Sequence, residues 1–236
     1  MNSKNDGDIS SSEFDEQVRT IVDLEIRDPA INIGLEEAIR ETVSRGGSLP
    51  TIRFWRNPRA AIIGRSQEAE VEVDLENCRA DKIPVVRRPT GGGAVLHHPN
   101  NLNYSIYLPE TSSTSVEQES IKMSKPVAWA LSDYGLDIRV EHNGLFAGST
   151  KIGGTAQSRR RGLLHHGTLL VKGDSIIREM DSFLRAEDCD YREIVSRVAS
   201  KPDQVSNLDN LVKARVRLLV LVKKMARSIA DALDRR

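Results

Sequence analysis

Three glycines in a row stand between two apolar stretches in the segment VVRRPTGGGAVLHHP, residues 85–99. Glycine loses more backbone entropy on folding than any other residue, so three together indicate that something approaches the backbone too closely for side chains. The N–H groups of such a turn can hold an anion, and Arg87 and Arg88 at its entrance add positive charge and forked hydrogen-bond donors. The segment therefore predicts an anion site, and a glycine-rich hairpin without a ligand is the alternative.

The glycine run matches neither of the two common nucleotide-binding loops. A P-loop needs GxxxxGK followed by Ser or Thr, and no lysine follows these glycines. A Rossmann fingerprint needs GxGxxG before a helix, whereas the apolar stretch after Gly93 is typical of a strand. The sequence thus predicts a glycine turn between two strands.

A second segment, TKIGGTAQSRRRGLLHHGTLLV at residues 150–171, combines a lysine with small residues and a histidine. The small residues at 153–156 again allow a close approach, here beside Lys151. Taken alone, Lys151 fits a solvated surface residue, and His166 fits a histidine that satisfies hydrogen bonds in a core. The arginines at 159–161 are typical of a basic loop, which can meet an acidic partner or a phosphate.

The composition argues against several classes of protein. The chain has 236 residues and a formal net charge of zero, so bulk attraction to nucleic acid or to an anionic membrane is not expected. Its two cysteines, Cys78 and Cys189, form no CxxC pair, which argues against a disulfide framework and a cysteine-based zinc site. The longest apolar run, 216–222, is too short to span a bilayer. We therefore expect a soluble, cytoplasmic protein with a polar, disordered lead over residues 1–17.

The first predicted elements are a helix and a hairpin. The helix is expected to begin after Asp28, which can cap it, with Pro29 in its first turn, and to end at the glycines at 46–47. Its apolar residues recur every four positions and are expected to form the buried face, namely Ile31, Leu35, Ile39 and Val43. Strands at 51–57 and 59–64 are expected to pair across Asn57 and Pro58.

The rest of the chain adds strands and helices in blocks. Further strands are expected at 82–88, 94–98, 102–109, 136–142, 150–156 and 163–171. The strand at 102–109 alternates and should turn Leu102, Tyr104, Ile106 and Leu108 inward. Helices are expected before Gly135, at 174–185 and over 208–233, and Pro126 predicts a kink or a division of the first of these into two short helices. This block order indicates an α+β fold.

Six segments resemble, in order, the lipoate–protein ligases of the biotin/lipoate ligase and lipoyl/octanoyl transferase superfamily. They read DPAINIGLEEAI, TIRFWRNPRAAIIGRSQ, RRPTGGGAVLHH, TKIGGTA, HHGTLLV and SRVASKPDQVSNL, and the likeness covers nearly all of residues 20–215. The resemblance implies a mixed, mostly antiparallel sheet flanked by helices. It also implies one catalytic domain over 18–236 without a C-terminal accessory domain.

The resemblance further implies an ATP-dependent ligase that joins lipoate or octanoate to a lysine through an acyl adenylate. Lys151 would be the catalytic residue that touches the acyl carbonyl and the phosphate. The implied ATP and adenylate site is Arg88, Gly91, Gly92, Gly93, Ala94, Val95, Leu96 and Lys151. The implied lipoate site is Arg65, His97, Gly153, Gly154, Thr155, Ala156, His166 and Gly167.

The resemblance also implies cofactors and partners. ATP would act with Mg²⁺, for which the sequence assigns no protein ligand. The acceptors would be lipoyl domains of 2-oxoacid dehydrogenases or the glycine cleavage H protein. A separate polypeptide can supply the accessory domain, and neither nucleic acid nor a membrane is expected as a partner.

Two alternatives stay open because the sequence departs from the ligase pattern. Ligases usually carry Asn-Asp before the lysine strand, and this chain has Asn143 and Gly144. The first alternative is an ATP-independent octanoyl or lipoyl transferase with Cys189 as its thioester nucleophile, although the surrounding acidic residues disfavour a thiolate there. Cys78 reads as a structural helix residue. The second alternative is a non-catalytic protein that binds an acyl group or an adenylate.

Overall fold

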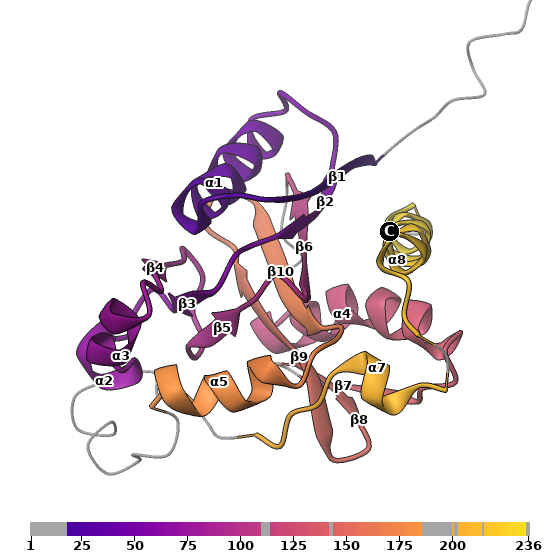
Figure 1. The fold of residues 1–236 in the computed structure, drawn as a ribbon. Helices are drawn as coiled ribbons and strands as arrows, with labels where there is room; N and C mark the ends of the chain where they lie inside the picture. The colour runs from indigo at the N-terminus through magenta and orange to yellow at the C-terminus, as the bar shows by residue number, and fades with distance from the viewer. Residues whose placement is uncertain are drawn as a thin grey trace, which may run out of the picture.

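The computed structural model describes residues 18–109, 114–141, 144–185, 200, 203–213 and 215–234. In this part of the chain the strands form a seven-stranded and a three-stranded sheet, flanked by helices (Figure 1). The predicted mixed, mostly antiparallel α+β fold is therefore confirmed. The predicted disordered lead over 1–17 lies outside the described residues.

The large sheet has the strand order β1-β2-β6-β10-β9-β8-β7. Only its β1–β2 pair is parallel. The sequence did not predict β1, and the other strands fall in predicted regions or, for β8, beside one. The strands are β1 (Arg19–Ile26), β2 (Thr51–Arg56), β6 (Asn101–Leu108), β7 (Ile138–Glu141), β8 (Gly144–Ala147), β9 (Thr150–Ser158) and β10 (Leu163–Leu170).

The small sheet contains β3 (Ala60–Ile63), β4 (Val85–Arg87) and β5 (Val95–His97), with β3 in the middle. The predicted hairpin between the strands at 51–57 and 59–64 is therefore wrong, because β2 pairs with β1 and β6 while β3 joins the other sheet. All four residues of β3 are buried, which suits a central strand better than a hairpin arm. The glycine turn crosses over the end of β3.

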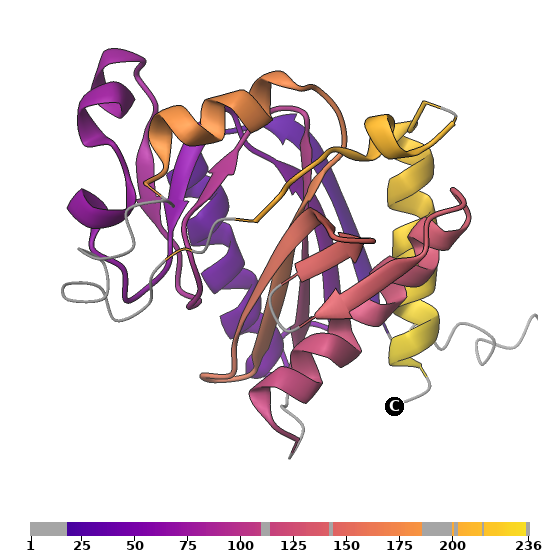
Figure 2. The same ribbon diagram turned by 90° about the horizontal axis from the view of Figure 1, so that it is seen from below.

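Helices cover both faces of the large sheet (Figures 1 and 2). The predicted helix with Pro126 inside it is one helix, α4, and the predicted helical region 208–233 is divided into α7 and α8. Within the described part of the chain, no helix is long and apolar enough to cross a membrane. The helices are α1 (Pro29–Ser44), α2 (Ala69–Glu72), α3 (Leu75–Ala80), α4 (Val116–Ser132), α5 (Ser175–Phe183), α7 (Leu208–Leu211) and α8 (Leu218–Leu233).

Alternation along the central strands separates the apolar core from a polar face. The predicted inward residues of β6 lie in the core that α4 and α8 cover, namely Leu102, Tyr104, Ile106 and Leu108. On β10, His165 points to this core and contacts Ser124 of α4, at 3.2 Å between Nε2 and Oγ. His166, the next residue, contacts α1 on the opposite face. Two consecutive histidines thus serve different surfaces.

Helix α1 begins as predicted but buries only part of the predicted face. The Asp28 carboxylate accepts from Ala30 N at 2.7 Å, and Pro29 occupies the first turn. The predicted apolar face is only partly right, because Val43 is buried and Ile39 is half-buried, whereas Ile31 is 58% exposed and Leu35 is 37% exposed. The helix also buries Pro29, Asn32, Ile33, Glu36 and Arg40. Asn32 and Glu36 reach partners on the large sheet, which a count of apolar residues does not reveal.

A backbone contact explains one of the glycines. A Cβ atom on Gly64, just after β3, would lie 2.1 Å from the carbonyl oxygen of Gly92 in the glycine turn. Gly92 itself has φ +89, a conformation that favours glycine. The turn therefore rests directly on the end of β3.

We expect Gly64→Ala to lower the free energy of unfolding by about 1–3 kcal/mol, because the added methyl group overpacks this contact. Gly34→Ala is the control, since nothing lies within 4 Å of a Cβ there. Gly34 is an exposed position of α1, so Ala in place of Gly there should stabilise the protein by roughly 0.5–1 kcal/mol. Chemical denaturation measures both values, and equal stability of the two variants would contradict the packing argument.

Two buried histidines should make stability depend on pH. Burial lowers the pKa values of His97 and His165 to about 3 in the folded protein, from 6.5 in an exposed histidine. Below pH 6.5 the unfolded chain therefore binds more protons than the folded one. The two neutral histidines make their full contribution to the free energy of unfolding above pH 6.5. That contribution falls as the pH drops from 6.5 towards 3, by up to about 1.4 kcal/mol per pH unit for each histidine. In guanidinium unfolding between pH 7 and 5, His165→Gln should show a shallower decline than the wild type, and an unchanged decline would refute this origin.

Candidate functional site

A cavity of about 440 Å³ lies between the glycine turn, α1 and the strands β9 and β10. Its apolar part contains Ile33, Trp55 and Ile62. Its polar part contains Lys151 and His166. The lining residues are Ile33, Trp55, Ile62, Arg88, Gly92, Gly93, Ala94, Val95, His97, Glu141, Phe146, Lys151, Gly154, Thr155, Ala156, His166, Gly167, Thr168, Ser200 and Asp203. We call this the first cavity.

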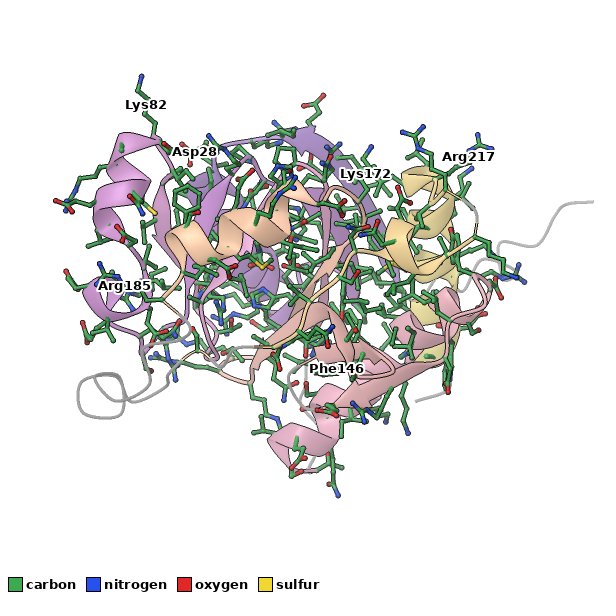
Figure 3. All side chains as sticks on the ribbon, turned by 60° about the horizontal axis from the view of Figure 1, so that its bottom comes forward. Asp28, Lys82, Phe146, Lys172, Arg185 and Arg217 are labelled. Atoms are coloured by element: carbon green, nitrogen blue, oxygen red, sulfur yellow. The ribbon has the colours of Figure 1, made fainter. Side chains whose placement is uncertain are left out.

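A second cavity of about 710 Å³ lies between β5, β9 and α5. Apolar residues of α5 and its end, Ile177, Met180 and Leu184, form one side. Figure 3 labels a residue of each cavity, Phe146 for the first and Arg185 for the second. The two cavities share a wall made of Ala94, Val95, Lys151, Gly154, Thr168, Ser200 and Asp203.

Most of the predicted site residues line these two cavities. The lining includes Arg88, Gly92, Gly93, Ala94, Val95, Leu96, His97, Lys151, Gly153, Gly154, Thr155, Ala156, His166 and Gly167. Arg65 and Gly91 line neither of them, and instead border a separate hollow of about 260 Å³ beside Arg159 and Arg160. Cys189 and Asn143 lie outside the described residues.

The buried guanidinium of Arg88 holds the glycine turn in shape. Its Nη2 donates to the carbonyl oxygens of Gly91 and Gly93 at 2.7 and 2.8 Å, and its Nη1 donates to Ile62 O at 3.1 Å. Burial lowers the pKa of Arg88 to about 10, so the side chain stays charged at neutral pH. Arg88 was predicted to bind adenylate, and these contacts give it a further, internal function.

A chain of buried hydrogen bonds runs from Arg88 to α1. Arg88 Nε donates to Thr90 Oγ1 at 3.0 Å, and the same oxygen lies 2.8 Å from His166 Nε2. His166 Nδ1 donates to the carboxylate of Glu36, at 2.9 and 3.0 Å from its two oxygens. Ser105 donates to the same carboxylate at 2.6 Å. These contacts orient the His166 ring between the glycine turn and α1.

His97 sits in a second chain on the same face. Its Nδ1 accepts from Asn57 Nδ2 at 2.9 Å, and its Nε2 donates to Thr168 Oγ1 at 3.0 Å. Thr168 donates onward to Asn103 at 2.7 Å. Asn32 of α1 donates to the other end of Asn57 at 2.7 Å. Helix α1 thus orients both site histidines through its buried polar residues.

Lys151 stands on the shared wall, paired with a carboxylate. Its Nζ lies 2.6 Å from Asp203 Oδ2 and 5.7 Å from the centre of the Phe146 ring. The lysine and the glycine turn line the same cavity, as predicted for a common cleft. The backbone of Lys151 also bonds to the Asp203 segment, because Lys151 N donates to Gln204 O at 2.8 Å and Ser206 N donates to Lys151 O at 3.0 Å.

Ser200 closes one side of the glycine turn. Its Oγ accepts from Ala94 N at 2.8 Å and donates to the buried carboxylate of Glu72 at 2.7 Å. A Cβ on Gly93 would lie 3.1 Å from Ser200. The amide of Ala94 is therefore occupied by the protein itself.

The described cysteine does not belong to the site. Cys78 is buried in α3, in agreement with its interpretation as a structural residue, and its apolar cluster also includes Leu96 and Met180 of the second cavity. Burial raises the pKa of the Cys78 thiol, and Asp74 and Asp81 raise it further. Neither described cavity contains Cys78, which is therefore a poor candidate nucleophile.

Sequence reasoning missed the residues that support the site. Glu36 and Thr90 lie inside segments that were singled out, but nothing in their spacing indicated a contact with His166. Ser200 and Asp203 come from the segment SKPDQVSNL, which carried only a resemblance. Their partners Glu72 and Lys151 are far away in the chain, so no local pattern could have found these pairs.

Comparisons with known proteins place this site in a family. The chain matches the lipoyl protein ligase A/B catalytic domain over residues 28–230. It is 31% identical over 200 residues to lipoate-protein ligase A subunit 1 of Thermoplasma acidophilum, which covers 79% of this chain and 73% of that protein. It is 27% identical over 230 residues to octanoyltransferase LipM of Clostridioides difficile, which covers 87% and 83%.

A shorter match covers less of its relative. A protein of Aeropyrum pernix, which carries the name of a lipoate-protein ligase A, is 37% identical over 148 residues. This match covers 62% of the present chain and 55% of that protein, or about half of the relative.

Solved structures share the fold. A protein of T. acidophilum with bound lipoic acid has a TM-score of 0.76 at 27% identity, over 92% of this chain and 86% of that one. A lipoate-protein ligase A bound with ATP gives the same four values. A bipartite lipoate protein ligase of T. acidophilum, described with its E2 lipoyl domain, has a TM-score of 0.73 at 28% identity, over 92% and 84%.

The match over residues 28–230 takes in the glycine turn, Lys151 and both cavities, and the solved structures repeat the same arrangement of sheets and helices. This protein belongs to the lipoyl protein ligase A/B catalytic-domain family.

Proposed function

We propose that this protein uses ATP to attach lipoate or octanoate to a lysine of a lipoyl domain, through an acyl adenylate. One observation carries the proposal. Lys151 stands on the wall shared by two cavities, so a single cation reaches ligands in both. A reaction that joins an acyl acid to a nucleotide needs two neighbouring pockets with a charged group between them.

The first cavity suits the acyl chain. Ile33, Trp55 and Ile62 give it apolar walls, and the small residues of β9 leave room beside them. Burial lowers the pKa of His97 to about 3, so this histidine adds no positive charge that would favour a polar ligand. A medium-length acyl group fits this chemistry.

The second cavity suits the nucleotide. A planar base can pack against Ile177, Met180 and Leu184, and Asp181 and Arg185 offer polar contacts beside it. The glycine turn and Lys151 border the space where the α-phosphate would lie. The solved relative bound with ATP supports a nucleotide as one of the two ligands.

The proposed reaction has two steps. A carboxylate oxygen of the acyl acid attacks the α-phosphorus of ATP, the bond to the bridging oxygen breaks, and pyrophosphate leaves. The neutral amine of the acceptor lysine then attacks the acyl carbon, the bond to the phosphate oxygen breaks, AMP leaves, and the new amide loses a proton to solvent. Negative charge grows on the phosphate and carbonyl oxygens in both steps, and the ammonium of Lys151 stabilises it.

Mg²⁺ fits this site only as a companion of the nucleotide. Among the described residues, no group of three or more His, Cys, Asp or Glu side chains can hold a metal. Asp203 and Glu141 line the first cavity, but they pair with Lys151 and Arg139. Mg²⁺ commonly binds through one or two carboxylates, water and substrate phosphates, and these two carboxylates are the candidates here.

The decisive experiment incubates purified protein with octanoate, a lipoyl domain and labelled ATP. The wild type should release AMP and acylate the domain. A second reaction adds a candidate accessory polypeptide, since a bipartite ligase is among the relatives. Lys151→Ala should lower kcat/KM by about 10²–10³-fold, because one fixed stabilising group is lost. Lys151→Arg should also fail, since a planar fork does not replace a compact ammonium. Near-normal turnover of either variant would refute the role of Lys151.

The second candidate is an ATP-independent octanoyl or lipoyl transferase. The similarity to an octanoyltransferase along most of the chain favours it. Such an enzyme needs a cysteine, and of the two in the sequence Cys189 is the candidate, because Cys78 is buried in an apolar cluster and lines neither cavity.

Cys189→Ser separates the two candidates. Under the ligase proposal no covalent enzyme intermediate forms, so this variant should keep wild-type activity in the ATP assay. A serine hydroxyl is a far weaker nucleophile than a thiolate, so a transferase would lose orders of magnitude in rate. An inactive but folded Cys189→Ser variant, with a thioester trapped on the wild type by mass spectrometry, would replace the ligase with the transferase.

A further inference from the structure

The ammonium of Lys151 is occupied by an internal anion. The Asp203 carboxylate lies 2.6 Å from Nζ, and both side chains are only partly exposed, at 21% for the lysine and 32% for the aspartate. Both residues line both cavities. Any anionic ligand that needs Lys151 therefore meets a competitor already in place.

Asp203 is held there by its own segment. The two backbone hydrogen bonds that join Lys151 to Gln204 and Ser206 continue as a parallel bridge between Lys151 and Val205. On the other side, the Ser200 amide and hydroxyl bond to the buried carboxylate of Glu72 at 3.1 and 2.7 Å. The hydrogen bonds of Gln204 and Ser206 thus hold the chain just after Asp203 beside Lys151.

The neighbouring acidic and small residues do not share this contact. Glu141 lines the first cavity but pairs with Arg139 at 3.1 Å. A Cβ on Gly144 would lie 2.8 Å from Lys151 Cε and 2.8 Å from Gly153 O, so a side chain there would clash with the lysine as it now lies. Among the described residues, Asp203 is the carboxylate within ion-pair distance of Lys151.

We propose that Asp203 is a specificity-determining residue, which reserves Lys151 for phosphate-bearing ligands and rejects a free carboxylate. The proposal rests on the proposed function, in that it takes the first cavity to bind an acyl acid. It adds that a fatty acid without nucleotide binds weakly, because it cannot displace Asp203. A nucleotide phosphate displaces it and opens the lysine to the acyl group.

Charge and effective concentration decide which anion occupies the ammonium of Lys151. If the carboxylate of a fatty acid replaces that of Asp203 at the Lys151 ammonium, the protein loses as much interaction energy as it gains. Asp203 also has the higher effective concentration, because it is tethered to the chain. A phosphate carries more oxygens and more negative charge, so its hydrogen bonds to an ammonium are stronger. A neutral thioester offers no charge at all and would leave the pair intact. The ion pair therefore favours a phosphate-linked acyl group over a thioester.

The test measures binding of octanoate alone, without nucleotide, by titration calorimetry. Asp203→Asn keeps a hydrogen-bond acceptor but removes the charge, so octanoate should bind about fivefold more tightly than to the wild type. Asp203→Glu, which keeps the charge, should remain near the wild type. A gain in affinity is informative because a damaged fold would weaken binding.

Two controls isolate the ion pair. Asp133→Asn removes one carboxylate from another lysine ion pair, that with Lys224, which lines neither cavity, and it should leave the octanoate affinity unchanged. Octanamide, the neutral analogue, should bind Asp203→Asn and the wild type equally. The proposal is overturned if Asp203→Asn gains nothing, if Asp133→Asn gains as much, or if octanamide gains as well. These binding results stand apart from the proposed ligase activity, whose failure would appear as absent AMP in the turnover assay.

Discussion

The shape of the glycine turn depends on one buried guanidinium, that of Arg88. It satisfies the carbonyl groups of Gly91 and Gly93, which would otherwise be turned inward without donors, at a cost of about 1–3 kcal/mol each. The same side chain donates to Thr90, whose hydroxyl contacts His166, and His166 in turn donates to Glu36 of α1. The turn, β10 and α1 are therefore held in one arrangement by consecutive hydrogen bonds.

The three glycines of the turn differ in what surrounds them. Gly92 adopts a positive φ and faces the guanidinium, Gly93 packs against Ser200, and nothing lies within 4 Å of a Cβ on Gly91. Contacts within the protein thus account for two of the three positions without any ligand. Gly91 borders the outer hollow beside Arg159 and Arg160, away from the two cavities. The close approach that the sequence implied is in large part an approach of the chain to itself.

Local signals predicted the elements well, and their partners poorly. The strands around the glycines, the cap at Asp28 and the inward side of β6 follow from turn residues and alternation, which act over a few residues. The buried face of α1 was predicted only in part, because Glu36 is buried against Ser105 and His166, which lie far along the chain and which an apolar pattern does not indicate. The β2–β3 hairpin failed for a related reason, since sheet membership depends on strands that come later. Most site residues that the family resemblance implied do line the two cavities. The contacts of Asp203 with Lys151 and of Ser200 with Ala94 became visible only in the folded structure.

Under the proposed function, the shared wall explains how this cleft would couple two ligands. Ala94 and Gly154 are small, so a ligand on either side approaches within reach of Lys151, and Thr168 connects the wall to His97. Larger side chains at these positions would separate the cavities and leave the lysine to one of them. Because Lys151 is paired with Asp203 on this same wall, the cation is neutralised whenever both cavities are empty. The wall therefore combines two properties, close contact between the ligands and a charge that a sufficiently anionic ligand uncovers.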